Sequence, residues 1–302
     1  MKKICFWPLA LAILMGACET QDEPTTPELS EAIYWTSPGE ENIRRGQLSD
    51  SLMPPTVETL FDQQDGVFGP YGIVANPQTR RLYWADYANR QIVAADLNGH
   101  QPPIILYDQN DGLTGPVGLA LDPNTQHIYW TEIPANTIVR GNINGQEAPT
   151  VLYDAEDGIR EPYDLKIAYQ QLYWVETLDR QIMVAPLDGT EAPRILYDGR
   201  HFLFRPYHIE IDRERHYLYV LENTPPGIGL GDRIARGSPD GQARLITIFA
   251  AKDGVNNAYT MSLDRQGQNI YWINQLEQGA IWRGSLNLIG PPRKLVEDIF
   301  LG

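Results

Sequence analysis

The sequence has little cysteine, a shortage of positive charge and no long apolar run after its first residues. Only Cys5 and Cys18 occur in 302 residues, so everything after Cys18 lacks disulfides and cysteine metal ligands. The 24 basic residues are outnumbered by 39 acidic ones, for a net charge of −15. A chain this acidic repels phosphate backbones and anionic lipid headgroups, which argues against a nucleic-acid-binding function.

The first 17 residues have the pattern of a secretory signal peptide. "MKK" precedes the apolar run "ICFWPLALAIL", which is too short for a convincing membrane span. We therefore expect residues 1–17 to be a targeting segment outside the folded domain.

Small residues directly before Cys18 resemble the lipobox of bacterial lipoproteins. Gly16 and Ala17 match that pattern, whereas Met15 stands where the family usually has leucine. The resemblance implies lipidation of Cys18 and a membrane-anchored lipoprotein of the bacterial cell envelope, periplasmic or surface-exposed, that touches the membrane only through its anchor. The alternative is a secreted protein in which Cys18 is a free thiol. Residues 18–30 are acidic and rich in Pro and Thr, which predicts a flexible linker.

A short aromatic motif recurs along the rest of the chain and holds five of the seven tryptophans. Its copies are "AIYWTS" at 32–37, "RLYWAD" at 81–86, "HIYWTE" at 127–132, "QLYWVE" at 171–176, "YLYVLE" at 217–222 and "NIYWIN" at 269–274. Repetition at a period of 20–50 residues is typical of solenoids, propellers and arrays.

Three further motifs recur in phase with the first. Segments such as "IVRGNING" follow each copy, and their first isoleucines lie 49, 46, 44, 52 and 47 residues apart. Segments such as "VLYD" and then "PVGLALD" complete the unit. Four short strands joined by tight turns describe an antiparallel meander, and six meanders arranged radially bury both of their faces. The sequence therefore predicts one all-β domain over residues 31–302, a six-bladed β-propeller of four-stranded antiparallel blades, with each Trp filling the wedge between adjacent blades.

The combination "IYWTE", "IVRGNING", "VLYD" and "PVGLALD" resembles the YWTD repeat, the class B repeat of low-density lipoprotein receptors. That resemblance implies the same six-bladed fold and, in the receptors, protein binding. The fourth YWTD position is Ser37 and Asn274 in the outer copies instead of an acid, which leaves the polar link between blades in doubt there. Only five copies of the innermost strand are visible, so the sixth must come from the segment before Tyr34 or from residues 298–302.

Loops that enter each innermost strand gather at one end of a propeller, and binding residues concentrate on such loops. Along one alternating set of the innermost strands the early blades have small residues, whereas the later blades have charged ones. The candidate ligand-binding residues at this channel mouth are Tyr163, Asp164, Lys166, Arg205, Tyr207, His208, Glu210, Asn256 and Tyr259.

Two interpretations of this cluster stay open. In the first interpretation, Lys166 and Glu210 form an ion pair between blades, while Asp164 and His208 form hydrogen bonds with the backbone of loops. Alternatively, Asp164, His208 and Glu210 hold a small polar or cationic ligand or a divalent metal ion, since carboxylate and imidazole are ordinary ligands for such ions. No cofactor is firmly predicted. The "DxxDG" loops, which begin at Asp62, Asp108 and Asp154, lack the oxygen spacing of an EF-hand and predict turns.

No nucleophile elbow, P-loop, Rossmann glycine set or HExxH motif occurs. We therefore favour a non-enzymatic scaffold that binds an envelope or extracellular protein, or another ligand, through its loop-rich face. A metal-dependent hydrolase or lactonase is the alternative, and a purely structural envelope component is a third hypothesis.

Overall fold

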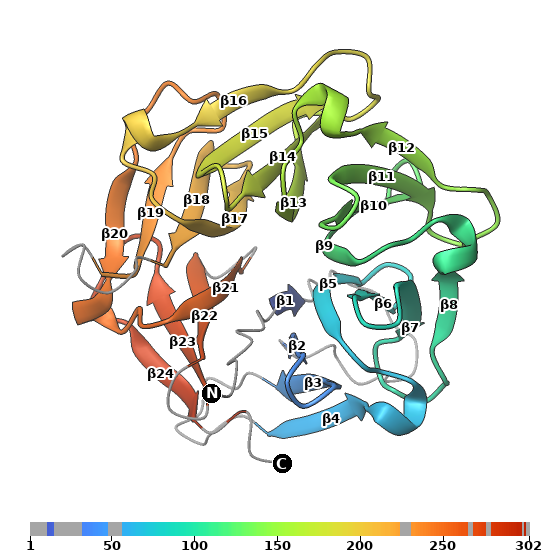
Figure 1. Ribbon diagram of the computed structural model, residues 1–302. Helices are drawn as coiled ribbons and strands as arrows, with labels where there is room; N and C mark the ends of the chain where they lie inside the picture. The colour runs from blue at the N-terminus through green and yellow to red at the C-terminus, as the bar shows by residue number, and fades with distance from the viewer. Residues whose placement is uncertain are drawn as a thin grey trace, which may run out of the picture.

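The computed structural model describes residues 11–14, 32–47, 56–223, 231–264, 268–275, 279–297 and 299. Six four-stranded antiparallel sheets surround a central axis, so the chain is a six-bladed β-propeller, as predicted (Figure 1). No helix within the described ranges is long and apolar enough to cross a membrane.

Each blade is a simple meander whose four strands follow one another in sequence. Blade 1 contains β1 (Leu11–Leu14), β2 (Ala32–Ser37), β3 (Asn42–Gln47) and β4 (Val57–Phe61). Blade 2 contains β5 (Pro70–Asn76), β6 (Arg81–Asp86), β7 (Gln91–Asp96) and β8 (Ile104–Tyr107). Blade 3 contains β9 (Pro116–Asp122), β10 (His127–Glu132), β11 (Thr137–Asn142) and β12 (Thr150–Tyr153).

The second half of the ring repeats the arrangement. Blade 4 contains β13 (Pro162–Ala168), β14 (Gln171–Glu176), β15 (Gln181–Pro186) and β16 (Arg194–Tyr197). Blade 5 contains β17 (Pro206–Asp212), β18 (Tyr217–Glu222), β19 (Arg233–Gly237) and β20 (Ile246–Ala250). Blade 6 contains β21 (Ala258–Leu263), β22 (Asn269–Asn274), β23 (Ala280–Ser285) and β24 (Arg293–Glu297).

Five short 3-10 turns lead from the outer strand of one blade to the inner strand of the next. They are η1 (Gln63–Asp65), η2 (Gln109–Asp111), η3 (Ala155–Asp157), η4 (Gly199–His201) and η5 (Ala251–Asp253). In η1, Asp62 Oδ1 accepts from Gln64 N at 2.7 Å, while Asp65 Oδ2 accepts from Asp62 N at 3.1 Å. The same reciprocal capping occurs at η2 and η3, which confirms that the "DxxDG" segments are turns.

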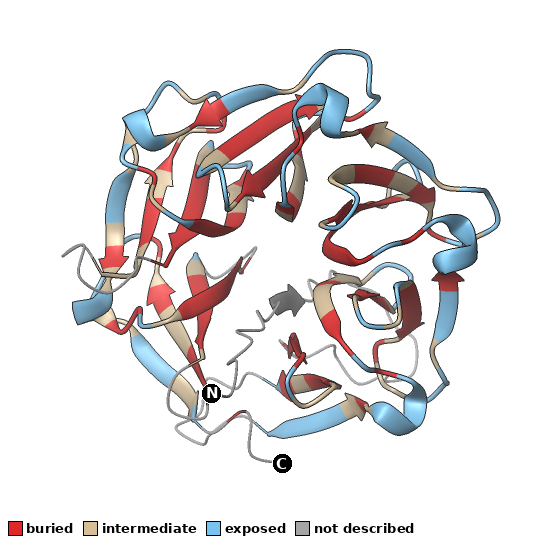
Figure 2. Cartoon of the chain, viewed as in Figure 1, coloured by how far each residue is buried: buried red, intermediate tan, exposed pale blue. Residues whose placement is uncertain are grey.

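Large aromatic side chains fill the wedges between blades, as expected. Trp84 of blade 2 stacks on Phe61 of blade 1 with ring centroids 5.6 Å apart, and Trp130 lies 5.3 Å from Tyr107 of the preceding blade. All five tryptophans of the recurring motif are fully buried. Burial is densest on the inner and middle strands, while the outer strands face solvent (Figure 2).

The missing innermost strand comes from the segment before Tyr34, the first of the two predicted alternatives. β1 pairs antiparallel with β2, with Leu11 opposite Trp35, and it contacts the inner strands β5 and β21 on either side. β1 thus belongs to the stretch with the signal-peptide pattern. The pairing of β1 with β2 does not test the prediction that residues 1–17 are removed. Cys18 and the predicted linker of residues 18–30 lie outside the described residues.

The ring closes by side-chain packing between blades 1 and 6. Ile33 and Trp35 share a buried cluster with Tyr271, Ile273, Ile281 and Ile299. The buried guanidinium of Arg44 donates to the carbonyl of Ile299 and pairs with Glu40 at 2.9 Å. Each blade therefore keeps its own four strands, and none is completed by a strand from the opposite end of the chain.

Candidate functional site

Two neighbouring inner strands, β13 and β17, bring the four predicted charged residues together. Equivalent positions in blades 2 and 3 are Gly72 and Gly118, where the inner strands approach closely. A Cβ on Gly118 would lie 2.2 Å from Tyr163 O, and one on Gly72 would lie 2.3 Å from Val117 O. Because blade 4 has Asp164 at this position, the next inner strand must leave room for a side chain.

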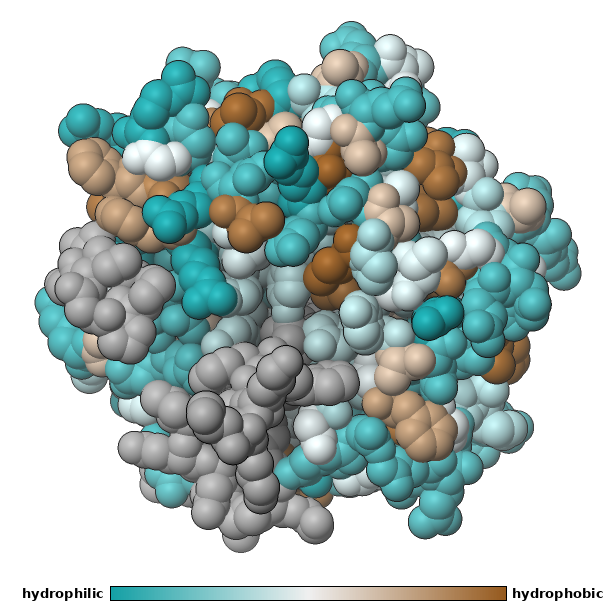
Figure 3. Space-filling view, in the orientation of Figure 1, coloured by the Kyte–Doolittle hydropathy of each residue, from teal (hydrophilic) through white to brown (hydrophobic). Residues whose placement is uncertain are grey.

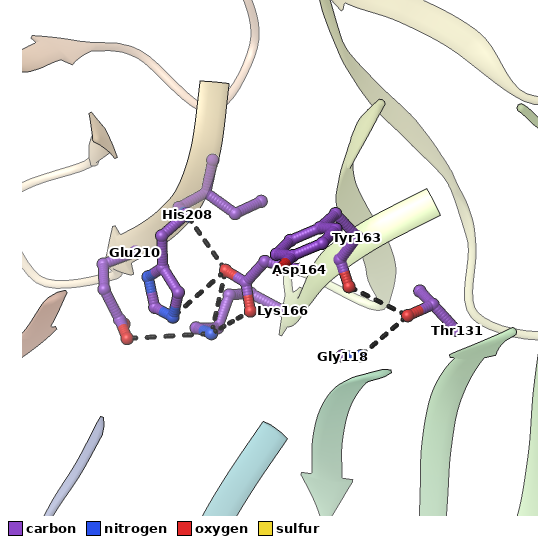
Figure 4. A network of polar contacts seen from close by, with 8 residues as sticks. Gly118, Thr131, Tyr163, Asp164, Lys166, His208 and Glu210 are labelled. Carbon is purple, nitrogen blue, oxygen red and sulfur yellow. Dashed lines mark hydrogen bonds and ion pairs between the residues drawn. The ribbon is translucent and has the colours of Figure 1, made fainter. Parts of the chain in front are cut away.

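The side chains of Asp164, Lys166, His208 and Glu210, which we call the interblade cluster, form one polar network (Figure 4). Lys166 Nζ lies 2.9 Å from Asp164 Oδ1 and 3.8 Å from Glu210 Oε1. This contact confirms the predicted ion pair between blades 4 and 5. Asp164 Oδ2 also accepts from Ile209 N at 2.9 Å and lies 3.4 Å from His208 Nε2.

One detail of the ion-pair interpretation was wrong. The backbone group bound by Asp164 belongs to the inner strand β17, because the two strands run side by side, and not to a loop. Within the described residues, the His208 ring makes no hydrogen bond to a loop backbone group, and its Nδ1 is buried without a partner there.

Burial sets the protonation of the interblade cluster. It lowers the pKa of His208 to about 3; Asp164 opposes this shift and Lys166 adds to it, so the imidazole is neutral near pH 7. Burial also disfavours the Lys166 ammonium, but the carboxylates of Asp164 and Glu210 outweigh it and raise the pKa of Lys166. The contact between His208 and Asp164 is therefore that of a neutral imidazole with a carboxylate, and Lys166 supplies the cluster's positive charge.

The interblade cluster does not fit a divalent metal ion. Lys166 Nζ lies between the carboxylates of Asp164 and Glu210, where an ion would be held. No group of three His, Cys, Asp or Glu side chains in the described ranges is arranged to hold a metal. Both carboxylates are already paired with an internal ammonium, so we derive no metal chemistry from them.

The predicted tyrosines form an aromatic arc at the channel mouth. Tyr207 packs edge to face against Tyr163 at 5.8 Å and against Tyr259 at 5.0 Å between ring centroids. The Arg205 guanidinium lies 5.0 Å above the Tyr207 ring. Burial raises the pKa of Tyr207 to about 12, so its phenol stays protonated. Asn256 is exposed, and its backbone N–H donates to the Asn274 side chain at 3.3 Å, and no hydrogen bond joins it to the tyrosines in the described part of the chain.

In blades 2 to 5, the acidic residue that ends the recurring aromatic motif accepts hydrogen bonds from the backbone of the loop that enters its blade. Glu132 accepts from Thr114 N and Gly115 N at 2.8 and 2.6 Å, and Glu222 accepts from Phe204 N at 2.8 Å. Asn274 makes a similar link through its side-chain amide, because its Nδ2 donates to Gly254 O at 2.8 Å. The buried hydroxyl of Ser37 has no partner within the described part of the chain, and the segment that would enter blade 1 lies outside that part.

Sequence reasoning missed three exposed apolar side chains on the loops of the channel-mouth face. They are Phe68, Leu178 and Phe202, which are 42%, 63% and 63% exposed. They belong to the loop entering β5, the β14–β15 turn and the loop entering β17. The repeat itself could have flagged Phe202, because it stands where the "DxxDG" loops have glycine.

Comparisons with known proteins define the fold and no family. No family model matches the chain, and no curated protein matches it. A chain of a nidogen/laminin complex has a TM-score of 0.69 at 20% identity, covering 85% of this chain and 90% of its own. Virginiamycin B lyase from Staphylococcus aureus has a TM-score of 0.64 at 14% identity, covering 95% and 83%. A gluconolactonase from Xanthomonas campestris has a TM-score of 0.57 at 19% identity, covering 75% and 76%.

These structures include a component of a protein complex and two enzymes. At such low identity they establish the six-bladed fold alone, because propellers carry both binding and catalytic functions. Function must therefore be argued from this chain's own residues.

Proposed function

We propose that this protein is a binding scaffold of the YWTD type that recognises another protein through its channel-mouth face. The observation that carries the proposal is the exposure of Phe68, Leu178 and Phe202 on loops of that one face. Apolar side chains set among polar ones are typical of protein interfaces, in which a few such residues supply most of the binding energy. Figure 3 shows this pattern of separate brown groups within a mainly teal surface around a hollowed centre.

The interblade cluster supports a scaffold more than an active site. Its charges are paired with one another across blades 4 and 5, which suits a role in holding the ring. A metal-dependent hydrolase would need an ion where Lys166 Nζ lies.

Two further features support the YWTD assignment. The acids at the fourth motif position bind loop backbone in blades 2 to 5, at Asp86, Glu132, Glu176 and Glu222. The nidogen structure, one of those to which this chain is similar, was solved in a protein complex. The sequence supports export and lipid anchoring at Cys18, which would hold the protein on a membrane of the cell envelope.

The test is to pan a random twelve-residue peptide library against the purified protein and measure the binding of the selected peptides. A variant with Phe68→Ser, Leu178→Ser and Phe202→Ser should lose most of this binding. The matched control replaces three exposed apolar residues of the outer strands, Ile104→Ser, Ile105→Ser and Ile246→Ser, and should bind normally. The proposal would be refuted if the selected peptides bind both variants equally, or if the library yields no binding peptide.

A further inference from the structure

The loop of residues 198–205, which we call the blade-5 loop, departs from its four counterparts at one backbone position. The residue after the 3-10 turn is left-handed in all five loops, and elsewhere it is glycine: Gly66, Gly112, Gly158 and Gly254. In the blade-5 loop it is Phe202, with φ 60° and ψ 33°. This backbone conformation costs a residue with a Cβ about 1 kcal/mol or more in conformational free energy, whereas glycine adopts it without that cost.

Packing does not offset this cost, because the Phe202 side chain is 63% exposed. A large apolar residue therefore occupies a position where glycine would fold at least as well, and it gains little burial in return. A strained residue retained without an internal benefit is typical of a functional site.

The blade-5 loop is held rigidly behind this side chain. Arg233 Nη2 donates to Phe202 O at 2.5 Å and pairs with the fully buried Glu222 at 2.7 Å. Asp198 caps the turn by accepting from Arg200 N at 2.9 Å. Because the loop is fixed before binding, a partner would not have to order it.

The charge of the blade-5 loop also differs from that of the loops entering blades 2, 3 and 4. At the position of Asp65, Asp111 and Asp157 it has His201, and it presents Arg200 and Arg205 to solvent. The Arg200 guanidinium lies 2.6 Å from Asp198 Oδ2, and that of Arg205 rests on the Tyr207 ring. An arginine supported in this way is well suited to bind a carboxylate.

We propose that the blade-5 loop is the main contact for an acidic peptide segment of the partner protein. An apolar side chain of that segment packs on Phe202, and flanking carboxylates bind Arg200 and Arg205. This inference rests on the proposed function, since it names the chemistry of the protein that the channel-mouth face recognises.

The probe is a fluorescein-labelled peptide, Glu-Asp-Leu-Phe-Glu-Asp-Leu-Glu, compared with one in which every acid is lysine and one in which Leu and Phe are serine. We expect the acidic apolar peptide to bind at least about tenfold more tightly than either control. Phe202→Gly and Arg205→Gln should each weaken its binding about fivefold to tenfold.

A matched control separates binding from backbone strain. Leu288 also has a positive φ, 57°, where other blades have Gly99, Gly145, Gly189 and Gly241, but it lies at the opposite end of the propeller and is 50% exposed. Leu288→Gly should leave peptide binding unchanged, and both glycine variants should keep the wild-type Tm within a few degrees. If the Phe202→Gly variant does not fold, peptide binding by the Arg205→Gln variant alone tests the inference.

The inference is overturned if the lysine peptide binds as tightly as the acidic one, or if neither Phe202→Gly nor Arg205→Gln weakens binding. The proposed function survives that result if library peptides still depend on Phe68 and Leu178. Both fail if no peptide distinguishes the triple serine variant from its outer-strand control.

Discussion

The hydroxyl of Thr131 joins two blades by bonding to Tyr163 of the next inner strand. Thr131 Oγ1 donates to Tyr163 O at 2.8 Å and accepts from Gly118 N at 2.8 Å (Figure 4). Thr36 makes the corresponding bond to Tyr71 O, also at 2.8 Å. The threonine of the recurring motif thus satisfies buried backbone groups that the sheets leave unpaired, and it links blade 3 to blade 4.

Replacing Thr131 with valine should destabilise the propeller by about 1–3 kcal/mol, because the Gly118 N–H and the Tyr163 carbonyl lose their buried partner. Chemical unfolding at neutral pH measures the change. Thr190→Val is the control, since that hydroxyl bonds only to Asp188 at the surface and its loss should change little. Equal losses in the two variants would argue against the interblade role.

Removing the ammonium of the interblade cluster should be costly. In Lys166→Met the carboxylates of Asp164 and Glu210 are left close together with no cation between them. We expect a loss of about 2–3 kcal/mol, less than for a fully buried pair, because Lys166 retains some solvent contact.

The double variant Lys166→Met with Asp164→Asn should recover part of this loss, because it removes one of the unpaired charges. Arg200→Gln, which breaks an exposed ion pair, should have little effect on stability. A stable Lys166→Met protein with an unchanged denaturation midpoint would mean that the interblade cluster does not hold the ring.

Protonation of His208 predicts a specific sensitivity to acid. Burial lowers its pKa to about 3 in the folded protein, whereas the unfolded chain binds the proton near its ordinary value of 6.5. The stabilising contribution is therefore complete above pH 6.5 and is lost as the pH falls from 6.5 toward 3, by at most about 5 kcal/mol.

Unfolding free energies at pH 7.5 and pH 5 measure this effect. His208→Gln removes the titrating group, so its free energy of unfolding should fall less between the two pH values than that of the wild type. A difference that is the same in both proteins would show that other groups dominate the acid response.

The position of β1 gives a prediction about the processed protein. A chain that begins at Cys18 lacks Leu11–Leu14, so the backbone of β2 loses its partner toward the channel. Each lost hydrogen bond costs about 1 kcal/mol, and we expect a Tm several degrees below that of the full chain. Deleting only residues 1–10 keeps β1 and should leave the Tm unchanged. If the chain beginning at Cys18 is as stable as the full one, the exported protein does not depend on β1.

The repeat predicted most of the fold because each unit contains its own turns and its own buried aromatic residues. The motif at 127–132 has the same bounds as β10, and the pairing of Lys166 with Glu210 followed from aligning inner strands. β1 escaped prediction as a strand, because "LAIL" is equally consistent with the apolar core of a signal peptide.

The finer features of the site depend on geometry that an alignment does not contain. Whether Lys166 lies between the two carboxylates or leaves room for a metal ion depends on the separation of two inner strands. Phe202 has the left-handed conformation that glycine has in the other loops, and only the structure shows that its side chain is exposed to solvent.

Closure of the ring without a shared strand makes blade 1 its mechanical weak point. In the part of the chain that the structure describes, blade 1 meets blade 6 through a shared buried cluster, the Arg44 bond and the contact of β1 with β21. At the other five seams the chain itself runs from one blade into the next. Blades 1 and 6 could therefore separate without breaking or unfolding a connecting loop.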